Sequence, residues 1–123
     1  MKERAYLTTT LPYVNADPHI GFALELVQAD IIARYLELTG KEVFFNTGTD
    51  EHGQKIYNKA TEAGQDPLEY AEPYSQKFRQ LNERLDVNVA NPNFNFIRTT
   101  DEHHIKAAQE FWTLCFKNGD IYK

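Results

Sequence analysis

The sequence predicts an α/β domain built on a parallel sheet that is flanked by helices. Short runs of β-branched and aromatic residues alternate with longer segments in which apolar residues recur every three or four positions. Strands and helices that alternate in this way are typical of parallel sheets with helical crossovers. A chain of 123 residues suffices for one compact domain, so we treat residues 1–123 as a single unit.

The first predicted strand covers residues 5–11, a β-branched and aromatic run that ends at Pro12. A loop over residues 12–18 leads to a long amphipathic helix that begins at His19 and stops at Gly40. We expect the apolar face of this helix to be buried. It consists of Ile20, Leu24, Val27, Ile31, Tyr35 and Leu38.

The second strand is predicted at residues 43–46, an uninterrupted apolar run typical of a strand covered on both faces. A helix over residues 51–63 follows it. The expected buried residues of that helix are Ile56, Tyr57, Ala60 and Ala63. The third helix begins with Asp66 as N-cap and Pro67 at its first position, and Pro73 predicts a kink or a restart. Its apolar stripe consists of Ala71, Tyr74, Phe78, Leu81 and Leu85.

An asparagine-rich loop precedes a short strand predicted at residues 96–98. The loop asparagines are Asn88, Asn91, Asn93 and Asn95. Thr99 and Glu102 fit a capping box at the start of the last helix, which stops at Gly119. The apolar face of that helix is expected to contain Ile105, Ala108, Trp112 and Cys115. Residues 120–123 are expected to begin a further strand, so we interpret the chain as the truncated N-terminal part of a larger domain; the alternative is a natural small domain with an edge strand.

Composition and charge restrict the partners of the chain. The net charge of −5 leaves no basic footprint of the kind that binds DNA, so other parts would have to supply most contacts to any RNA. No apolar run is long enough to cross a membrane. The single cysteine, Cys115, excludes an internal disulfide and suits a reducing cytoplasm.

Metal and nucleophile chemistry find little support in the sequence. The spacing of the histidines matches no zinc motif, so we expect no metal site formed by this chain alone. These histidines are His19, His52, His103 and His104. Ser75 and Cys115 both fall within predicted helices, which argues against a serine or cysteine nucleophile.

Residues 11–22 link the first strand to the N-terminus of the long helix and carry groups suited to nucleotide binding. A helix N-terminus presents free N–H groups that favour phosphate. Gly21 permits close approach of a base or a phosphate, and His19 can donate a hydrogen bond to a phosphate oxygen. The alternative is that His19 only caps the helix and that Gly21 is incidental.

Residues 47–54 follow the second strand, so they are expected to lie at the same edge of the sheet as the first segment. Asp50 can pair with the ammonium group of a ligand, or it can serve only as a helix cap. His52 can likewise be a structural residue held by the loop backbone.

Taken together, these segments resemble the methionyl-tRNA synthetase family over nearly the whole chain. The shared motifs are residues 10–15 (TLPYVN), 18–21 (PHIG), 29–30 (AD), 33–35 (ARY), 48–53 (GTDEHG) and 98–100 (RTT). The resemblance implies a class I synthetase Rossmann-like (HUP-type) fold, of which this chain holds the first half. The implied reaction uses ATP with Mg²⁺ to convert methionine to methionyl-adenylate and then transfers the methionine to tRNA(Met).

The resemblance also implies roles for individual residues. The catalytic residues would be His19 and Gly21. The ATP-binding residues would be Asn15, His19, Gly21 and Phe22. The methionine-binding residues would be Leu11, Tyr13 and Asp50, with Asp50 on the substrate ammonium group. Apolar and aromatic walls suit a thioether, which offers no strong hydrogen-bonding group.

The chain departs from the family pattern at two points. The family signature ends in a second histidine, whereas this chain has Phe22, which can stack on a base but cannot donate a hydrogen bond. The Lys-Met-Ser-Lys-Ser loop, the zinc-knuckle cysteines and the anticodon-binding helices do not occur in the sequence. We therefore expect the family zinc site to lie outside this chain and the chain alone to be inactive.

Three alternative functions remain open at this point. A nucleotidyltransferase with a related signature shares the ATP site but is not expected to carry residues 11–13 or 49–53. A synthetase for leucine, isoleucine, valine or cysteine is the second alternative. The third is a degenerate module that binds nucleotide or a protein without catalysis. Phe22 is evidence for this alternative, whereas the presence of His19 and Asp50 is evidence against it.

Overall fold

Three parallel strands form the single sheet of the computed structural model, which describes residues 2–87, 89 and 91–122. The strands are β1 (Arg4–Thr8), β2 (Glu42–Thr49) and β3 (Phe94–Arg98), in the spatial order β1-β2-β3. Tyr6 lies opposite Phe44 in the first pair, and Phe45 opposite Phe94 in the second. Asn88 of the predicted loop lies outside the described residues.

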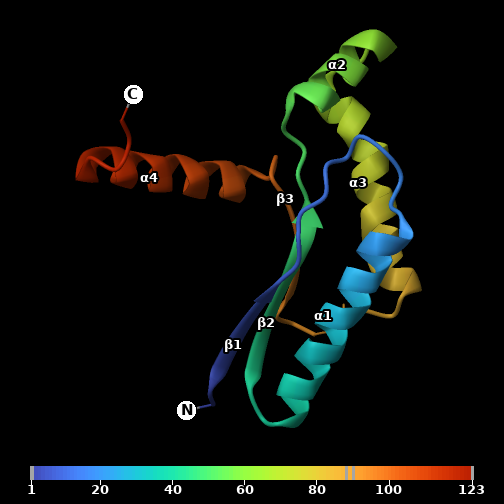
Figure 1. The fold of residues 1–123 in the computed structure, drawn as a ribbon, viewed down its shortest axis with the longest axis vertical. Coiled ribbons are helices and arrows are strands. Elements are labelled where there is room, and N and C mark those ends of the chain that lie inside the picture. The colour runs from blue at the N-terminus through green and yellow to red at the C-terminus, as the bar shows by residue number, and fades with distance from the viewer. Residues whose placement is uncertain (1, 88, 90, 123) are drawn as a thin grey trace.

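Four helices accompany the sheet, and they confirm the α/β class. They are α1 (Ile20–Leu38), α2 (Gln54–Ala63), α3 (Pro67–Arg84) and α4 (Glu102–Asn118). Helices α1 and α3 lie beside one face of the sheet, whereas α4 projects away from it (Figure 1). Within the described residues, no helix is both long enough and apolar enough to span a membrane.

The core consists of two buried clusters. The first joins α1 to the sheet and contains Leu26, Ala29, Ala33, Val43, Phe45 and Val87. The second packs α2 and α3 beneath the loop after β1 and contains Val14, Ile56, Ala71 and Phe78. The second cluster therefore anchors the loop that carries most of the predicted site residues.

The predicted buried face of α1 is wrong. Its two end members, Ile20 and Leu38, are 85% and 87% exposed. The helix buries Leu26, Ala29, Asp30 and Ala33 instead. Small alanine side chains let the helix backbone approach the sheet closely, and α1 is apolar on more than one side, so periodicity alone did not select the correct face.

The second strand is covered on one face only, contrary to the prediction for residues 43–46. Val43 and Phe45 are buried, but Phe44 is 40% exposed and stacks on Tyr6 with ring centroids 5.3 Å apart. The reason is that α1 and α3 occupy the same side of the sheet (Figure 1).

Several predicted boundaries differ from the observed ones. Strand β1 ends at Thr8, not at residue 11, and β2 continues to Thr49 because its last residues pair with β3. Helix α2 begins three residues later than predicted, and Tyr57 on it is exposed. Helix α3 runs through Pro73, so the predicted restart is absent.

Helix α4 differs most from its prediction. Its N-cap is Asp101, not Thr99, because the Thr99 side chain accepts from the Glu51 amide, just after β2. None of its residues is buried, so the expected packed face with Trp112 does not form within the described chain. The described residues after Gly119 form no strand, and Lys123 lies outside them.

Candidate active site at the carboxyl edge of the sheet

The loop after β1 and the end of β2 meet at the carboxyl edge of the sheet, as predicted. The Asp50 amide donates to the carbonyl of Pro12 at 2.9 Å, and the Val14 amide donates to the carbonyl of Asp50 at 3.3 Å. These two hydrogen bonds form an isolated parallel bridge between Tyr13 and Asp50. Two of the residues predicted to bind an amino acid are thus fixed side by side through their backbones.

A cavity of about 190 Å³ lies next to this bridge. It is lined by Tyr13, His52, Gly53, Gln54, Lys55 and Ile56. Gly53 has a φ of 135°, and a Cβ built on it would lie 3.6 Å from the Tyr13 ring. The Tyr13 ring is therefore one wall of the cavity, whereas neither Leu11, half-buried in the same loop, nor Asp50 is among its lining residues.

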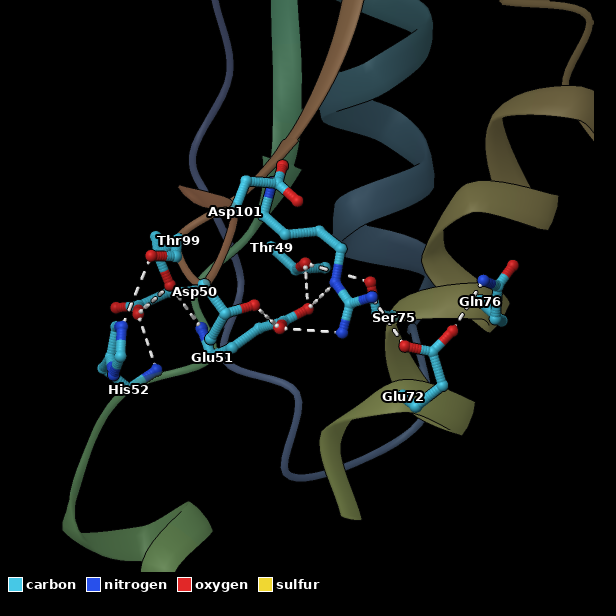
Figure 2. Close-up of polar contacts among 11 residues, drawn as sticks. Thr49, Asp50, Glu51, His52, Glu72, Ser75, Gln76, Thr99 and Asp101 are labelled. Carbon is cyan, nitrogen blue, oxygen red and sulfur yellow. Dashed lines mark hydrogen bonds and ion pairs between the residues drawn. The ribbon is translucent and has the colours of Figure 1, made fainter. Parts of the chain in front are cut away.

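One oxygen of the Asp50 carboxylate is held by hydrogen bonds. Oδ1 accepts from the His52 amide at 3.1 Å and from the Thr99 hydroxyl at 3.3 Å (Figure 2). Among the described residues, no hydrogen bond reaches Oδ2. The predicted alternative of a plain helix cap is not observed, because Gly53 is the N-cap of α2. Oδ2 is free to accept from a ligand.

Behind Asp50 lies a charged cluster around Glu51, which is 4% exposed. Arg98 donates to both Glu51 carboxylate oxygens, from Nε at 2.7 Å and from Nη2 at 2.9 Å, and from Nη1 to Glu72 at 2.6 Å. The hydroxyls of Thr49 and Thr100 also donate to Glu51. Figure 2 shows Glu51, in the segment that follows β2, and Glu72 on α3 pointing toward each other. This ion-pair cluster links β2, β3 and α3 directly beneath the site.

The electrostatics of the cluster favour the ionised forms. Burial raises the pKa of Glu51, but the hydrogen bonds from Arg98, Thr100 and Thr49 outweigh it, so the pKa lies below its ordinary value. The hydrogen bond to Glu51 is the main reason that the pKa of Arg98 is raised. Both groups are therefore charged at neutral pH.

Glu51→Gln is expected to lower the free energy of unfolding by about 2 kcal/mol at pH 7, because it removes charge-assisted bonds from a buried cluster. A carboxylate with a lowered folded-state pKa stabilises the fold above the pKa of the unfolded chain, about 4.3, and this contribution is lost as the pH falls. Denaturant unfolding followed by circular dichroism between about pH 7 and pH 3 should therefore show a flatter pH dependence for the variant.

Glu42→Gln is the matched control, since Glu42 pairs with Arg4 at 3.1 Å on the exposed end of the sheet. An exposed ion pair contributes little to stability, so the free energy of unfolding of this variant should lie within about 0.5 kcal/mol of that of the unaltered chain. Equal pH slopes for Glu51→Gln and the unaltered chain would contradict the role given to Glu51.

His19 caps α1 through one of its two ring nitrogens, which leaves the other nitrogen free for a ligand. Its Nδ1 accepts from the Gly21 amide at 3.1 Å, so the proton of the neutral ring lies on Nε2. A Cβ at Gly21 would lie 2.9 Å from Cε1 and 3.0 Å from Nδ1 of His19. Gly21 is thus required for this ring position, and the exposed Nε2–H is a donor at a helix N-terminus.

The other two residues predicted to bind ATP flank His19 in the sequence. Phe22 stacks on the His19 ring at 4.2 Å and meets the edge of Phe78 at 5.5 Å, so part of its surface belongs to the second core cluster. Asn15 is half-buried, and its carbonyl accepts from Lys59 at 2.6 Å. Their roles toward ATP stay predictions.

Sequence reasoning gave no role to two groups that support the site. Glu25 accepts from the Thr10 amide at 2.9 Å and from its hydroxyl at 2.5 Å, which fixes the start of the site loop. Arg98 and Thr99 hold the end of β2. A signal for the second group existed, because residues 98–100 follow a third parallel strand at the same edge.

Among residues 2–87, 89 and 91–122, no three His, Cys, Asp or Glu side chains gather closely enough to hold a metal ion.

A parallel sheet with a site loop and a capped helix N-terminus at its carboxyl edge is the architecture of class I aminoacyl-tRNA synthetases, and comparison with known proteins agrees. The chain belongs to the family described as tRNA synthetases class I (M), whose model matches residues 5–123.

Two curated relatives and one solved structure show the extent of the similarity. The methionine–tRNA ligase of Thermotoga maritima is 50% identical over 118 residues, which cover 96% of this chain and 18% of that protein. The chloroplastic/mitochondrial methionine–tRNA ligase of Arabidopsis thaliana is 47% identical over 121 residues, 98% of this chain and 19% of that protein. The methionyl-tRNA synthetase of Mycobacterium tuberculosis in complex with methionyl-adenylate matches with a TM-score of 0.89 and 40% identity, over 98% of this chain and 23% of that one. The chain spans about a fifth of the length of the relatives it matches.

Proposed function

We propose that this chain is the N-terminal part of the catalytic domain of a methionine–tRNA ligase. The observation that carries the proposal is the backbone bridge between Tyr13 and Asp50, which sets the aromatic wall of the cavity next to a residue whose Oδ2 accepts no hydrogen bond among the described residues. An amino acid with an unbranched apolar side chain needs both groups: a carboxylate for its ammonium group and an apolar wall for its thioether. The similarity to a structure that contains methionyl-adenylate supports the same reading.

In the proposed reaction, a carboxylate oxygen of methionine attacks the α-phosphorus of ATP, and the bond from that phosphorus to the pyrophosphate oxygen breaks. Asp50 Oδ2 accepts hydrogen bonds from the methionine ammonium group, while Leu11 and Tyr13 border the side chain. His19 Nε2–H donates to a phosphate oxygen as negative charge develops there. Gly21, Asn15 and Phe22 complete the ATP side, and Mg²⁺ accompanies ATP as part of the substrate.

The remaining steps belong to the longer protein. Transfer of methionine to tRNA(Met) and the family zinc site are proposed to lie with parts outside these residues. The exposed sheet face around Phe44 and the unpacked helix α4 are consistent with a larger domain. A cytoplasmic location stays a prediction, because one of the two curated relatives is named chloroplastic/mitochondrial.

A chimera tests the proposal. Residues 5–123 replace the matching segment of the Thermotoga maritima ligase, and methionine-dependent ATP–pyrophosphate exchange is measured. We expect exchange within about tenfold of the parent enzyme, because the matched segments are 50% identical. The isolated 123-residue chain should show no exchange above background, since it carries only part of an active site.

Two results would contradict the proposal in different ways. A folded chimera without methionine-dependent exchange would indicate a degenerate module that has lost catalysis. Exchange driven by leucine, isoleucine, valine or cysteine in preference to methionine would indicate another synthetase specificity. Exchange at an ordinary rate by the isolated chain would overturn the expectation that it is incomplete.

A further inference from the structure

We propose that Thr99 is a positioning residue for methionine activation: its hydroxyl fixes the Asp50 carboxylate and so leaves Oδ2 free for the substrate ammonium group. This inference rests on the proposed function. It concerns the residue that follows β3, which the sequence pattern predicts only as a helix cap and as part of the shared motif 98–100.

The Thr99 hydroxyl has one orientation that satisfies its surroundings. Thr99 is 9% exposed, and its Oγ1 accepts from the Glu51 amide at 2.8 Å. With that lone pair occupied, the hydroxyl proton is directed to the other neighbour, Asp50 Oδ1, at 3.3 Å. A single buried hydroxyl thus ties the backbone of Glu51 to the side chain of the residue before it (Figure 2).

The backbone of Thr99 holds the same segment. Its amide donates to the carbonyl of Thr49 at 3.1 Å, and its carbonyl lies 3.3 Å from Nε2 of His52. The His52 amide in turn donates to Asp50 Oδ1 at 3.1 Å. The hydroxyl, the amide and the carbonyl of Thr99 therefore all contact the segment 49–52. Within that segment, Oδ1 of Asp50 accepts two hydrogen bonds, one from the Thr99 hydroxyl and one from the His52 amide.

Arg98 makes this support rigid. Its two bonds to the carboxylate of Glu51, at 2.7 and 2.9 Å, fix the side chain whose backbone amide donates to Thr99. A group that orients a substrate-binding carboxylate such as that of Asp50 in this way raises affinity by preorganisation, because less freedom is lost when the ligand binds.

The test compares two neighbouring threonines in the chimera. Thr99→Val keeps the shape of the side chain but removes the hydroxyl, and with it the hydrogen bond to Asp50 and the acceptor of the Glu51 amide. Thr100→Val is the matched control, because the Thr100 hydroxyl donates to Glu51 and not to Asp50. We expect Thr99→Val to raise KM for methionine about tenfold, the lower range for a hydrogen bond to a charged group, with KM for ATP unchanged.

Three further measurements separate positioning from a loss of stability. Thr100→Val should lower the unfolding temperature as much as Thr99→Val does, yet leave KM for methionine within about twofold. Thr99→Ser keeps the hydroxyl and should restore most of the methionine affinity. Adding Thr99→Val to Asp50→Asn should raise KM little further, because residues that act through one another are not additive.

The outcomes distinguish this proposal from the proposed function. A chimera that fails to activate methionine contradicts the proposed function. If the chimera is active but Thr99→Val and Thr100→Val raise KM for methionine equally, the positioning role of Thr99 is contradicted and the proposed function is not. Fully multiplicative effects of Thr99→Val and Asp50→Asn would also overturn it, since Thr99 would then act independently of Asp50.

Discussion

Asp50→Asn in the chimera is expected to lower kcat/KM for methionine by about 10²-fold. A hydrogen bond to a charged group contributes about 1.5–3 kcal/mol, and the ammonium group of the substrate would lose its anionic partner. Asparagine keeps the volume and one acceptor oxygen, so the contacts from His52 and Thr99 to Oδ1 can persist. Methionine-dependent ATP–pyrophosphate exchange at several methionine concentrations measures the effect, with KM for ATP expected to change little.

A substrate analogue makes this prediction sharper. A methionine analogue without its amino group should inhibit the unaltered chimera far more weakly than an analogue that keeps it, and Asp50→Asn should remove most of that difference. Asp66→Asn is the matched control, because Asp66 caps α3 through its side chain and asparagine caps equally well. Undiminished discrimination between the two analogues in Asp50→Asn would show that another group binds the ammonium.

The topology of the chain was predictable because its signals are local. The β-branched run before Pro12, the apolar run at Val43 and Phe45, and the N-cap at Asp66 each determine an element within a few residues. The face that each helix buries depends on distant residues. Helix α1 uses Ala29 and Ala33 against β2, a choice that periodicity could not show because larger apolar residues lie elsewhere on the helix.

The site was predictable to the extent that strand ends determine it. Tyr13 and Asp50 follow β1 and β2, and parallel strands bring their ends to one edge. Thr99 was assigned as a helix cap because Glu102 lies three residues later, which matches the capping-box pattern. In the structure the Thr99 hydroxyl instead accepts from the Glu51 amide, a contact between the segments that follow β3 and β2. A local pattern cannot reveal a partner almost fifty positions away.

Phe22 illustrates how packing changes the reading of a motif. By resemblance, the position of Phe22 corresponds to a second histidine, and its replacement suggested a weakened ATP site. In the structure the Phe22 ring stacks on the His19 ring and meets the edge of Phe78 of the core, with centroids 4.2 and 5.5 Å away. Phe22 thus supports the position of the His19 ring. This contact explains how His19 is held in place although position 22 is not a histidine.

His19→Ala in the chimera is expected to lower kcat for adenylate formation by about 10²–10³-fold, the usual effect of removing one preorganised donor to developing charge. The physical reason is the cap: with Nδ1 bonded to the Gly21 amide, Nε2–H is the donor that the ring presents at the helix N-terminus. Single-turnover formation of methionyl-adenylate measures the chemical step, and KM for methionine should change little because His19 lies on the ATP side.

Two companion variants separate the donor from the cap. Gly21→Ala keeps the histidine itself, but the new Cβ would lie 2.9 Å from Cε1 of His19, so the ring must move and kcat should fall as well. His103→Ala removes another exposed histidine from the first turn of a helix, α4, and should leave kcat unchanged. Losing the cap costs about 0.5–2 kcal/mol of stability, which unfolding curves record separately. If His19→Ala lowers stability by that amount but leaves kcat within about threefold of the unaltered chimera, His19 is a structural cap and the phosphate donor must be sought elsewhere on the sheet edge.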